Sequence, residues 1–432
     1  MKKYLSIWTV VAISGILLSC SSSDAEEDLG ETKRVANMLS VPQYIQLTDE
    51  QKTFVNDNND FTLKFLKSAN QAGPSGKSFI YSPLSITYVL GMVNAAATGQ
   101  TEKELEQTLG FHQGGIQAVN EYCKNLIDNL PKVDEKVKLN IANAIFINQE
   151  MAKLKAQYQQ DMVKYYDAKA EALDFKSPKT LEHINGWCKD KTQGMIPTIL
   201  DEVNPKVVSY LLNAIYFKAD WSSKFDPKNT RKETFTTEKG TTQQPMMHQT
   251  VLISYTHNDT FSAVKIPYGN GMWEMTVLLP EDGKSTDDVI DEMAGYGSFL
   301  TTYLSVPMAS YEVDLKLPRF DTTSDTDQLK GKLIGLLQKM GIHLAFDPNF
   351  AEIPNMCEND DVFISMMRQK AAIKVNEEGS EAAAVTVGGA MVTSTSIGSY
   401  PKATFHANHP FVYIISEASS DVILFVGKYT GE

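Results

Sequence analysis

The chain of 432 residues has a formal net charge of −13 at pH 7, and 42% of its residues are hydrophobic. A chain of this size and composition can bury a large core, arranged as one large domain or as two. The negative charge, with no basic run along the sequence, argues against nucleic acid as a partner.

The N-terminus has the pattern of a secretory signal. Two lysines precede an apolar stretch from Leu5 to Leu18, which is too short to span a membrane as a helix. The sequence from Leu17 to Cys20, LLSC, resembles the bacterial lipoprotein box. This resemblance implies that residues 1–19 are removed and that the thiol of Cys20 carries a lipid anchor. The alternative is ordinary secretion with an incidental cysteine.

Residues 20–40 are predicted to form a flexible tether, because the sequence behind Cys20 is polar and acidic with little apolar surface. Acidic residues at this place also resemble the surface-export signal of Bacteroidetes lipoproteins. We therefore expect an outer membrane lipoprotein exposed at the cell surface, with secreted or periplasmic localisation as the alternative. No repeat and no second linker follow, which favours one domain over residues 41–432.

Two helix starts are well marked. Thr48-Asp-Glu-Gln51 is a capping box, and the helix that follows is expected to bury Phe54, Phe61 and Phe65. Ser82 is a good helix cap, because proline follows it at the first helical position.

Strands are predicted where apolar residues run together or alternate with polar ones. These segments are Asn140–Ile147, Ala263–Pro267, Trp273–Leu279, Glu312–Leu317, Ala372–Val375, Ala403–Phe405, Phe411–Ile415 and Val422–Val426. They alternate with helices, but without the regular repeat of a doubly wound sheet, so the class is α+β.

Several motifs of enzymes and metal proteins are incomplete. Gly73–Ser78 ends like a phosphate loop, but Gln71 stands where the motif needs its first glycine. His406 and His409 have no third ligand nearby, and no Gly-x-Ser-x-Gly elbow occurs. We therefore predict no catalytic residues, no metal and no cofactor, which leaves a surface hydrolase as a remote alternative.

The other cysteines are scattered. Cys123, Cys188 and Cys357 cannot all pair, and their spacing fits no zinc site. Buried free thiols are expected.

The segment between the predicted strands Ala372–Val375 and Ala403–Phe405 is unusual, because it has more than 20 residues with almost no charge. A connection of this length normally carries a function. Every second residue is small. These residues are Ser380, Ala382, Ala384, Thr386, Gly388, Ala390 and Val392. The pattern suits insertion into a sheet, while the competing interpretation is an alanine-rich helix capped by Ser380.

Within this segment, Val375–Ala384 reads VNEEGSEAAA and closely resembles the hinge of the reactive-centre loop of serpins, the loop-inserting protease inhibitors. Other segments match family motifs in the family's order. They are Phe79–Ile86, Thr98–Phe111, Leu212–Trp221 and Gln338–Pro348. The resemblance covers Phe61–Tyr429 and implies three β-sheets, eight to nine helices and an exposed reactive-centre loop at about residues 377–402.

The resemblance assigns roles to three groups of residues. The hinge comprises Glu377, Glu378, Gly379, Ser380, Glu381, Ala382, Ala383 and Ala384. The breach, where the loop enters the main sheet, comprises Trp221, Arg319 and Glu377. The shutter, near the middle of that sheet, comprises Ser82, Ser85, Asn213 and Gln369.

Two of these positions depart from the family's usual residues. Gln369 replaces a histidine that would contact Asn213, and Arg319 replaces a lysine that would pair with Glu377. Glutamine offers both a donor and an acceptor but does not titrate, so we expect the shutter to be less sensitive to pH than in relatives with histidine. Arginine keeps the charge of lysine with better geometry for a carboxylate.

Counting from the hinge as in the family places the reactive bond at Thr393–Ser394. Counting back from Phe405 places it nearer Ser396, so the full range is Met391, Val392, Thr393, Ser394, Thr395 and Ser396. No lysine or arginine occurs from Gly379 to Tyr400, which argues against trypsin-like targets. The sequence favours elastase-like or subtilisin-like serine proteases, and papain-like cysteine proteases as a further class.

The resemblance implies a monomeric suicide substrate whose partner is the target protease, held as a covalent acyl complex. The chain itself would be no enzyme. The alternative is a non-inhibitory serpin that acts as a surface binding protein. Such members typically carry bulky or charged hinge residues, whereas this hinge is small at every second position from Ser380 onward.

Overall fold

The computed structural model describes residues 41–295, 308–358, 362–380 and 400–432. They belong to one compact unit, Ser40–Glu432. The helices within these ranges are α2 (Asp49–Ala72), α3 (Pro83–Asn94), α4 (Gly99–Leu109), α5 (Gly115–Asn129), α6 (Ala156–Tyr166), α7 (Pro178–Lys191), α8 (Thr286–Gly295) and α9 (Lys332–Met340). Within the described ranges, no helix is long and apolar enough to cross a membrane. The predicted lipidation at Cys20 and the predicted leader and tether lie outside these ranges.

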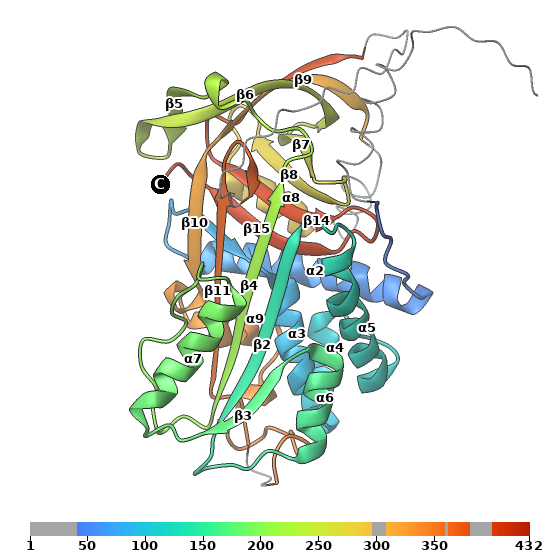
Figure 1. Cartoon of the computed structure of the whole chain (residues 1–432), viewed down its shortest axis with the longest axis vertical. Helices are drawn as coiled ribbons and strands as arrows, with labels where there is room; N and C mark the ends of the chain where they lie inside the picture. Colours follow the sequence, from blue (N-terminus) through green and yellow to red (C-terminus); the bar gives the residue numbers. More distant parts are fainter. Residues whose placement is uncertain (1–40, 296–307, 359–361, 381–399) are drawn as a thin grey trace, which may run out of the picture. The chain divides into compact units, whose positions relative to one another are not determined.

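A six-stranded sheet forms the main sheet (Figure 1). Its order is β10-β11-β12-β4-β2-β3. The strands are β2 (Lys138–Asn148), β3 (Lys169–Leu173), β4 (Ser209–Asp220), β10 (Phe320–Asp325), β11 (Met366–Val375) and β12 (Gly379–Ser380). The long strands β2, β4, β10 and β11 run side by side, and β12 lies between β11 and β4 at one end.

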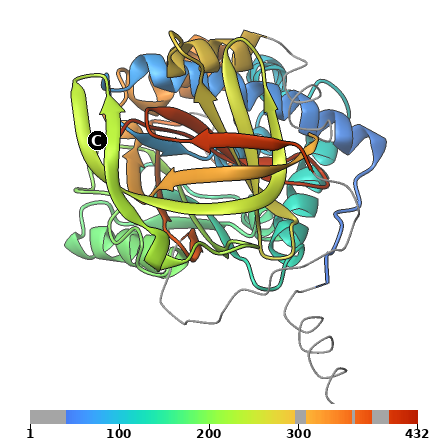
Figure 2. The same cartoon turned by 90° about the horizontal axis from the view of Figure 1, so that it is seen from above.

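The other strands form one continuous nine-stranded sheet (Figure 2). Its main path is β1-β15-β14-β8-β7-β6-β9-β13, and β5 pairs with β6. In Figure 2 the long yellow-green strand β6 curves past the orange strand β9. The strands are β1 (Phe79–Tyr81), β5 (Arg231–Thr237), β6 (Gly240–His257), β7 (Phe261–Tyr268), β8 (Trp273–Pro280), β9 (Ser310–Pro318), β13 (Lys402–His406), β14 (Phe411–Glu417) and β15 (Ile423–Tyr429).

The described strands therefore make two hydrogen-bonded sheets where three were expected. The reason is the length of β6, which has 18 residues. One end of β6 pairs with β7 from Ser254 to His257, its middle pairs with β9 from Met246 to Ser254, and its other end pairs with β5. Two sheets that a shorter strand would leave separate are thus joined.

The inner strands β2 and β4 of the main sheet are buried on both faces, to which successive side chains of a strand point in turn. On β2, Ile145 and Ile147 join the large core that contains α3, whereas Ala144 and Phe146 join a smaller core that contains residues of α7. The predicted strand at Asn140–Ile147 is thus confirmed, with packing on each side.

Both predicted helix starts are also confirmed. The side chain of Thr48 accepts a hydrogen bond from the backbone N–H of Gln51, and the side chain of Gln51 accepts one from the backbone N–H of Thr48. Ser82 caps α3, with Pro83 at the first helical position. Every residue of α3 is buried, so this cap sits inside the protein rather than at its surface.

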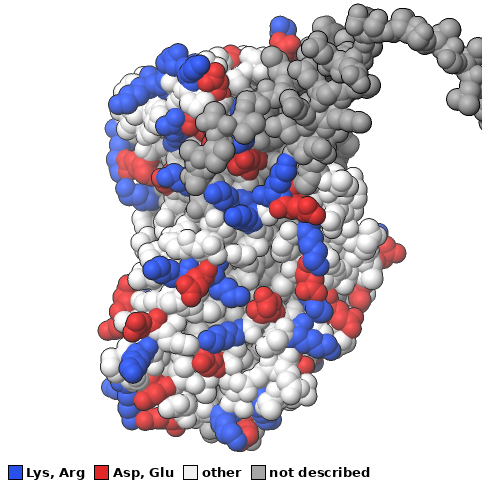
Figure 3. Space-filling model, viewed as in Figure 1, with Lys and Arg blue, Asp and Glu red and all other residues white. Residues whose placement is uncertain are grey.

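The surface carries charges of both signs. Lysine and arginine side chains are interspersed with aspartate and glutamate over the face in Figure 3. Mixed charges of this kind give no extended basic surface on the described part of this face.

Candidate functional site

Strands β4 and β11 are hydrogen-bonded to each other at one end and separated at the other. We call the boundary between these two strands the seam. The two strands pair in parallel from Tyr210 opposite Met366 to Ala214 opposite Lys370. Beyond this row, in the described residues, β12 takes the place between them: Gly379 lies opposite Asp220 of β4, and Ser380 opposite Val375 of β11. The chain after β11 therefore turns back and enters its own sheet.

The two residues of β12 fit closely. Ser380 is fully buried, and its hydroxyl lies 2.6 Å from the hydroxyl of Tyr268, whose ring stacks on Trp221 at 4.3 Å between centroids. At Gly379 φ is +154°, and a Cβ there would lie 2.0 Å from the carbonyl oxygen of Ala219. Only glycine fits at this point. Ser380, a predicted hinge residue, thus lies on a strand and not at the start of a helix.

Trp221 and Arg319, two of the expected breach residues, hold the turn before β12. The indole Nε1 of Trp221 donates to the carbonyl of Asn376 at 2.8 Å, and its backbone N–H donates to Glu378 at 2.8 Å. The side chain of Glu378 contacts Lys224 at 2.5 Å. The turn is therefore bound on several sides by the end of β4 and the segment after it.

Glu377 lies in this turn and is nearly buried, with 6% of its side chain exposed. Its carboxylate accepts hydrogen bonds from Arg319, at 2.7 Å from Nε, and from Thr230. Burial alone would raise the pKa of Glu377, but the hydrogen bonds from Arg319 and Thr230 outweigh it and lower the pKa. The carboxylate is thus kept charged by its partners.

The expected shutter residues meet around Gln369, which is fully buried on β11. Its Oε1 accepts from the backbone N–H of Ser82 at 3.0 Å, and its Nε2 donates to the carbonyl of Ser82 at 2.9 Å and to Asn213 at 3.1 Å. Asn213 donates to Asn143 of β2 at 2.9 Å, and the hydroxyl of Ser82 donates to that of Ser85 at 3.1 Å. This network joins α3, β11, β4 and β2 without any charged group.

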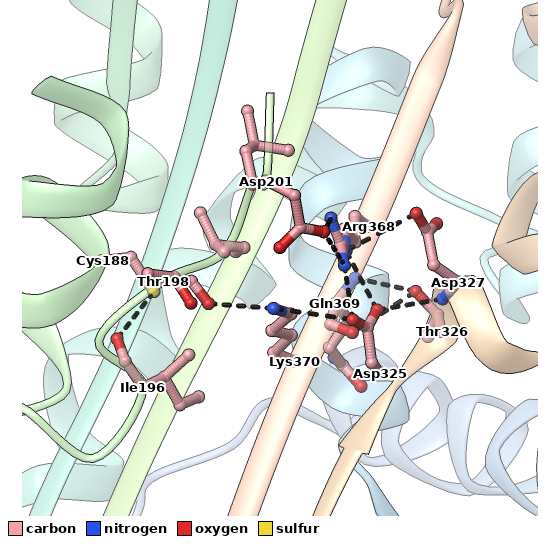
Figure 4. Close-up of polar contacts among 12 residues, drawn as sticks. Cys188, Ile196, Thr198, Asp201, Asp325, Thr326, Asp327, Arg368, Gln369 and Lys370 are labelled. Carbon is pink, nitrogen blue, oxygen red and sulfur yellow. Dashed lines mark hydrogen bonds and ion pairs between the residues drawn. The ribbon is translucent and has the colours of Figure 1, made fainter. Parts of the chain in front are cut away.

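A second polar cluster, on the other face of β11, was missed by the sequence analysis (Figure 4). Arg368 is 6% exposed, and its guanidinium makes two contacts with Asp325, at 2.9 and 2.5 Å. Burial alone would raise the pKa of Asp325, but the hydrogen bond from Arg368 helps to lower it. An arginine inside an apolar strand is rarely buried without a partner, and this was the available signal.

Arg368 and Lys370 also contact the segment that follows α7. The guanidinium of Arg368 lies 3.3 Å from Asp201, and the ammonium of Lys370 donates to the carbonyl of Thr198 at 3.0 Å (Figure 4). Lys370 lies 3.6 Å from Asp325. The cluster thus connects β10, β11 and the segment after α7.

The remaining groups considered in the sequence are a candidate metal ligand, His406, and three cysteine thiols. His406 lies 3.0 Å from Asp314 on β9, and no group of three metal-binding side chains is found in the part of the chain that the structure describes. The thiols of Cys123, Cys188 and Cys357 are buried, and burial raises the pKa of Cys188 to about 12 and of Cys357 to about 11. These thiols are therefore poor nucleophiles.

The remaining expected site residues fall outside the described ranges. They are Glu381, Ala382, Ala383, Ala384, Met391, Val392, Thr393, Ser394, Thr395 and Ser396.

Comparison with known proteins agrees with this geometry. Residues 56–431 match the family model Serpin (serine protease inhibitor). Human Serpin B8 is 30% identical, over 86% of this chain and 98% of its own length. An uncharacterised serpin-like protein of Thermococcus kodakarensis is 30% identical, over 88% of this chain and 86% of its own.

Solved structures give the same result. The thermophilic serpin tengpin in its native state has a TM-score of 0.77 and 25% identity, over 92% of this chain and 98% of its own. Human thyroxine-binding globulin has a TM-score of 0.76 and 26% identity, over 88% of this chain and 99% of its own. The family match covers most of the sequence, and the fold is confirmed by the structures. The chain therefore belongs to the serpin family.

Proposed function

We propose that this serpin inhibits proteases as a suicide substrate. The observation that carries the proposal is the split seam of the main sheet, with Ser380 buried at its mouth between β4 and β11. A strand that continues from Ser380 toward Lys370 would complete the sheet. The small side chains at every second position from Ser380 onward suit that place, because a close-packed interior tolerates little extra volume.

In the proposed mechanism the target protease supplies the chemistry. It attacks a bond between Met391 and Ser396, best placed at Thr393–Ser394, and forms an acyl-enzyme. The cut frees the segment that begins at Ser380 to insert between β4 and β11, and the attached protease moves with it. A displacement of about 1 Å in a catalytic site can cost about 100-fold in rate, so distortion of the protease stalls hydrolysis.

Insertion of the cleaved segment releases enough free energy to drive the proposed mechanism. Insertion of about 12 residues forms ladder hydrogen bonds, each of which contributes about 0.5 to 1.5 kcal/mol, so the gain is on the order of 10 kcal/mol before side-chain burial. Gly388 and Gly389 weaken the new strand, because glycine is unfavourable in a strand interior. They come late in the segment, after insertion has begun.

The residue roles follow from this mechanism. We propose that Trp221, Arg319 and Glu377 hold the hinge until cleavage, and that Ser82, Ser85, Asn213 and Gln369 hold the middle of the sheet. We further propose a monomer anchored through Cys20 at the outer face of the outer membrane. The targets are elastase-like or subtilisin-like serine proteases, with papain-like cysteine proteases as a further class.

The test uses the protein from Lys33 onward, incubated with neutrophil elastase, subtilisin, papain and trypsin. Denaturing gels and mass spectrometry then follow the products. We expect a denaturant-resistant complex with an apolar-specific protease and a released peptide that starts between Val392 and Ile397. If every protease cuts the loop and turns over, inhibition of these targets fails. If cleavage also leaves the melting temperature unchanged, the result favours the alternative function, a non-inhibitory surface binding protein.

A further inference from the structure

A small cavity lies at the open edge of the main sheet, separated from the seam by β2. Its volume is about 400 Å³, and it is bordered by α6, by the start of β3 and by the last part of α7. Among the described strands, β3 pairs with β2 alone and ends the order of this sheet (Figure 1). The cavity therefore belongs to neither the breach nor the shutter.

One side of the cavity is apolar. Trp187 of α7 borders it, and the indole ring makes an edge contact with Phe146 at 5.9 Å between centroids. Ala168 and Ala170 border it next to α6, and their small side chains leave the space open. Val163 of α6 completes this side, although the residue is 66% exposed. An exposed valine beside a partly buried tryptophan offers a surface that an apolar ligand can cover.

Hydrogen bonds hold the walls of the cavity in place. Asp167 ends α6 with φ of +44°, and the backbone N–H of Ala168 donates to the carbonyl of Met162 at 3.1 Å. On the open edge of β3, the carbonyl of Ala170 accepts a hydrogen bond from Nε2 of Gln159 at 3.0 Å. This bond occupies an edge group that an added peptide strand would need. The cavity is thus better suited to a small molecule than to a peptide.

The charged residues that line the cavity are two lysines and one aspartate, so its formal charge is +1 in a chain of net charge −13. The ammonium of Lys169 is already engaged, because it lies 2.8 Å from Glu171 and 3.1 Å from His183. Burial alone would raise the pKa of Glu171, but the hydrogen bonds with Lys169 and His183 lower it. Lys169 is therefore matched by a charged carboxylate.

The second lysine of the lining, Lys191, is in a different situation. It is the last residue of α7 and is exposed. Within the ranges that the structure describes, its ammonium makes no hydrogen bond and no ion pair. An ammonium without a partner, beside an apolar cavity, favours a ligand that combines an apolar body with a negative charge.

We propose that this cavity binds an amphipathic carboxylate with the chemistry of a medium-chain fatty acid. The alkyl chain lies against Trp187, Val163 and Ala170, and the carboxylate pairs with Lys191. Because each buried CH₂ group adds to the free energy of transfer from water, affinity should rise with chain length until the cavity is full. The inference goes beyond the proposed function and does not rest on it, since the proposed insertion assigns no role to these residues.

The test measures the binding of decanoate, below its micelle concentration, to the protein from Lys33 onward, which contains the whole compact unit. Calorimetry gives the affinity, and tryptophan fluorescence gives the location, because Trp187→Phe removes the part of the signal that arises at the cavity. We expect saturable binding of decanoate and weaker binding of decylamine, which carries the opposite charge. Lys191→Met should weaken decanoate binding about two- to fivefold, as for one exposed ion pair. Val163→Ser should weaken it by about the same factor, because apolar contact is lost.

Lys189→Met and Leu252→Ser are the matched controls. Lys189 lies on α7 outside the lining of the cavity, and Leu252 is 47% exposed on β6. All four substituted side chains are exposed, so these variants keep the fold. Both controls should bind decanoate as the wild type does.

Three results would overturn the inference. Decanoate may fail to bind, or it may bind and leave the fluorescence of Trp187 unchanged, and in either case the cavity is not the site. Equal affinity of Lys191→Met and the wild type, or of decanoate and decylamine, would show that the cavity does not select a carboxylate. None of these results affects the formation of a complex with proteases, so the proposed function is tested separately.

Discussion

The two ends of the seam between β4 and β11 are held by different kinds of contact. At the split end, charged groups surround the turn before β12, and Arg319, which pairs with Glu377, is 43% exposed. At the paired end, Gln369 is fully buried in a network of neutral amides and hydroxyls. Charged contacts near solvent break readily, because water can replace either partner. A buried polar group that loses its hydrogen-bond partner must find another one inside the protein. For the proposed insertion, this comparison predicts that the sheet opens from the split end and that its centre resists.

The largest expected effect comes from placing a charge at the mouth of the seam. Ser380→Arg must bury a guanidinium beside Tyr268, and an unpaired buried charge costs several kcal/mol. We expect insertion to slow by at least about 100-fold, so that the loop is cut but no stable complex forms on denaturing gels. Ser380→Ala is the matched control and should still form the complex. A stable complex with Ser380→Arg would show that this end of the seam is not the entry point.

The second-largest effect is expected in the network around Gln369, at the centre of the main sheet. Gln369→Ala leaves the backbone N–H of Ser82 and the side-chain oxygen of Asn213 without Gln369 as their partner, at about 1 to 3 kcal/mol for each buried group. We expect the free energy of unfolding to fall by about 2 to 4 kcal/mol in denaturant titrations. Gln369→His is the control, because it restores the hydrogen bonds and adds a group that titrates near pH 6.5. Equal stability of Gln369→Ala and wild type would contradict the central role of this network.

A smaller effect is expected at the charged end. Arg319→Ala leaves the carboxylate of Glu377 with Thr230 as its remaining side-chain partner. Because Arg319 is partly exposed, we expect a loss of about 1 to 2 kcal/mol, less than for a fully buried pair. Thermal unfolding measures this loss, and Arg319→Lys should recover most of it. A loss as large as that of Gln369→Ala would remove the contrast between the two ends.

The smallest effect is the pH dependence of the same end. The pKa of Glu377 is lowered from its usual 4.5, so its charged form stabilises the fold above that value. This stabilisation is lost as the pH falls through the lower pKa of the folded state. Glu377→Gln should therefore be less stable than wild type at pH 7, and the difference should shrink below about pH 4.5. A constant difference across this range in thermal unfolding would show that the carboxylate charge contributes nothing.

Much of the fold was accessible from local patterns. The capping box at Thr48 and the cap at Ser82 follow from side-chain chemistry within four residues, and the strand Asn140–Ile147 follows from its continuous burial. The strand β6 was not predicted, because it is polar, contains Pro245 and is only partly buried along most of its length. Its pairing with β7 and β9 joins two sheets, and such long-range pairing leaves no local signal.

The candidate site could be predicted from the sequence only in part. Motif resemblance brought Gln369, Asn213 and Ser82 into one group, and their hydrogen bonds give the group a physical basis. The position of Ser380 inside the sheet depends on how far β4 and β11 separate, which no sequence pattern states. The contacts of Arg368 join segments that lie far apart in the chain. The only sequence signal for them is that an arginine stands in a buried strand.

The central claim is that the split seam admits the cleaved loop as a new strand. The most direct measurement is thermal unfolding of the protein before and after a single cut in the loop, made by a protease that it does not trap, with a crystal structure of the cut form. The account predicts a marked rise in melting temperature and a strand beginning at Ser380 that separates β4 from β11 along its length. An unchanged melting temperature, with Ala214 still paired opposite Lys370, would contradict it.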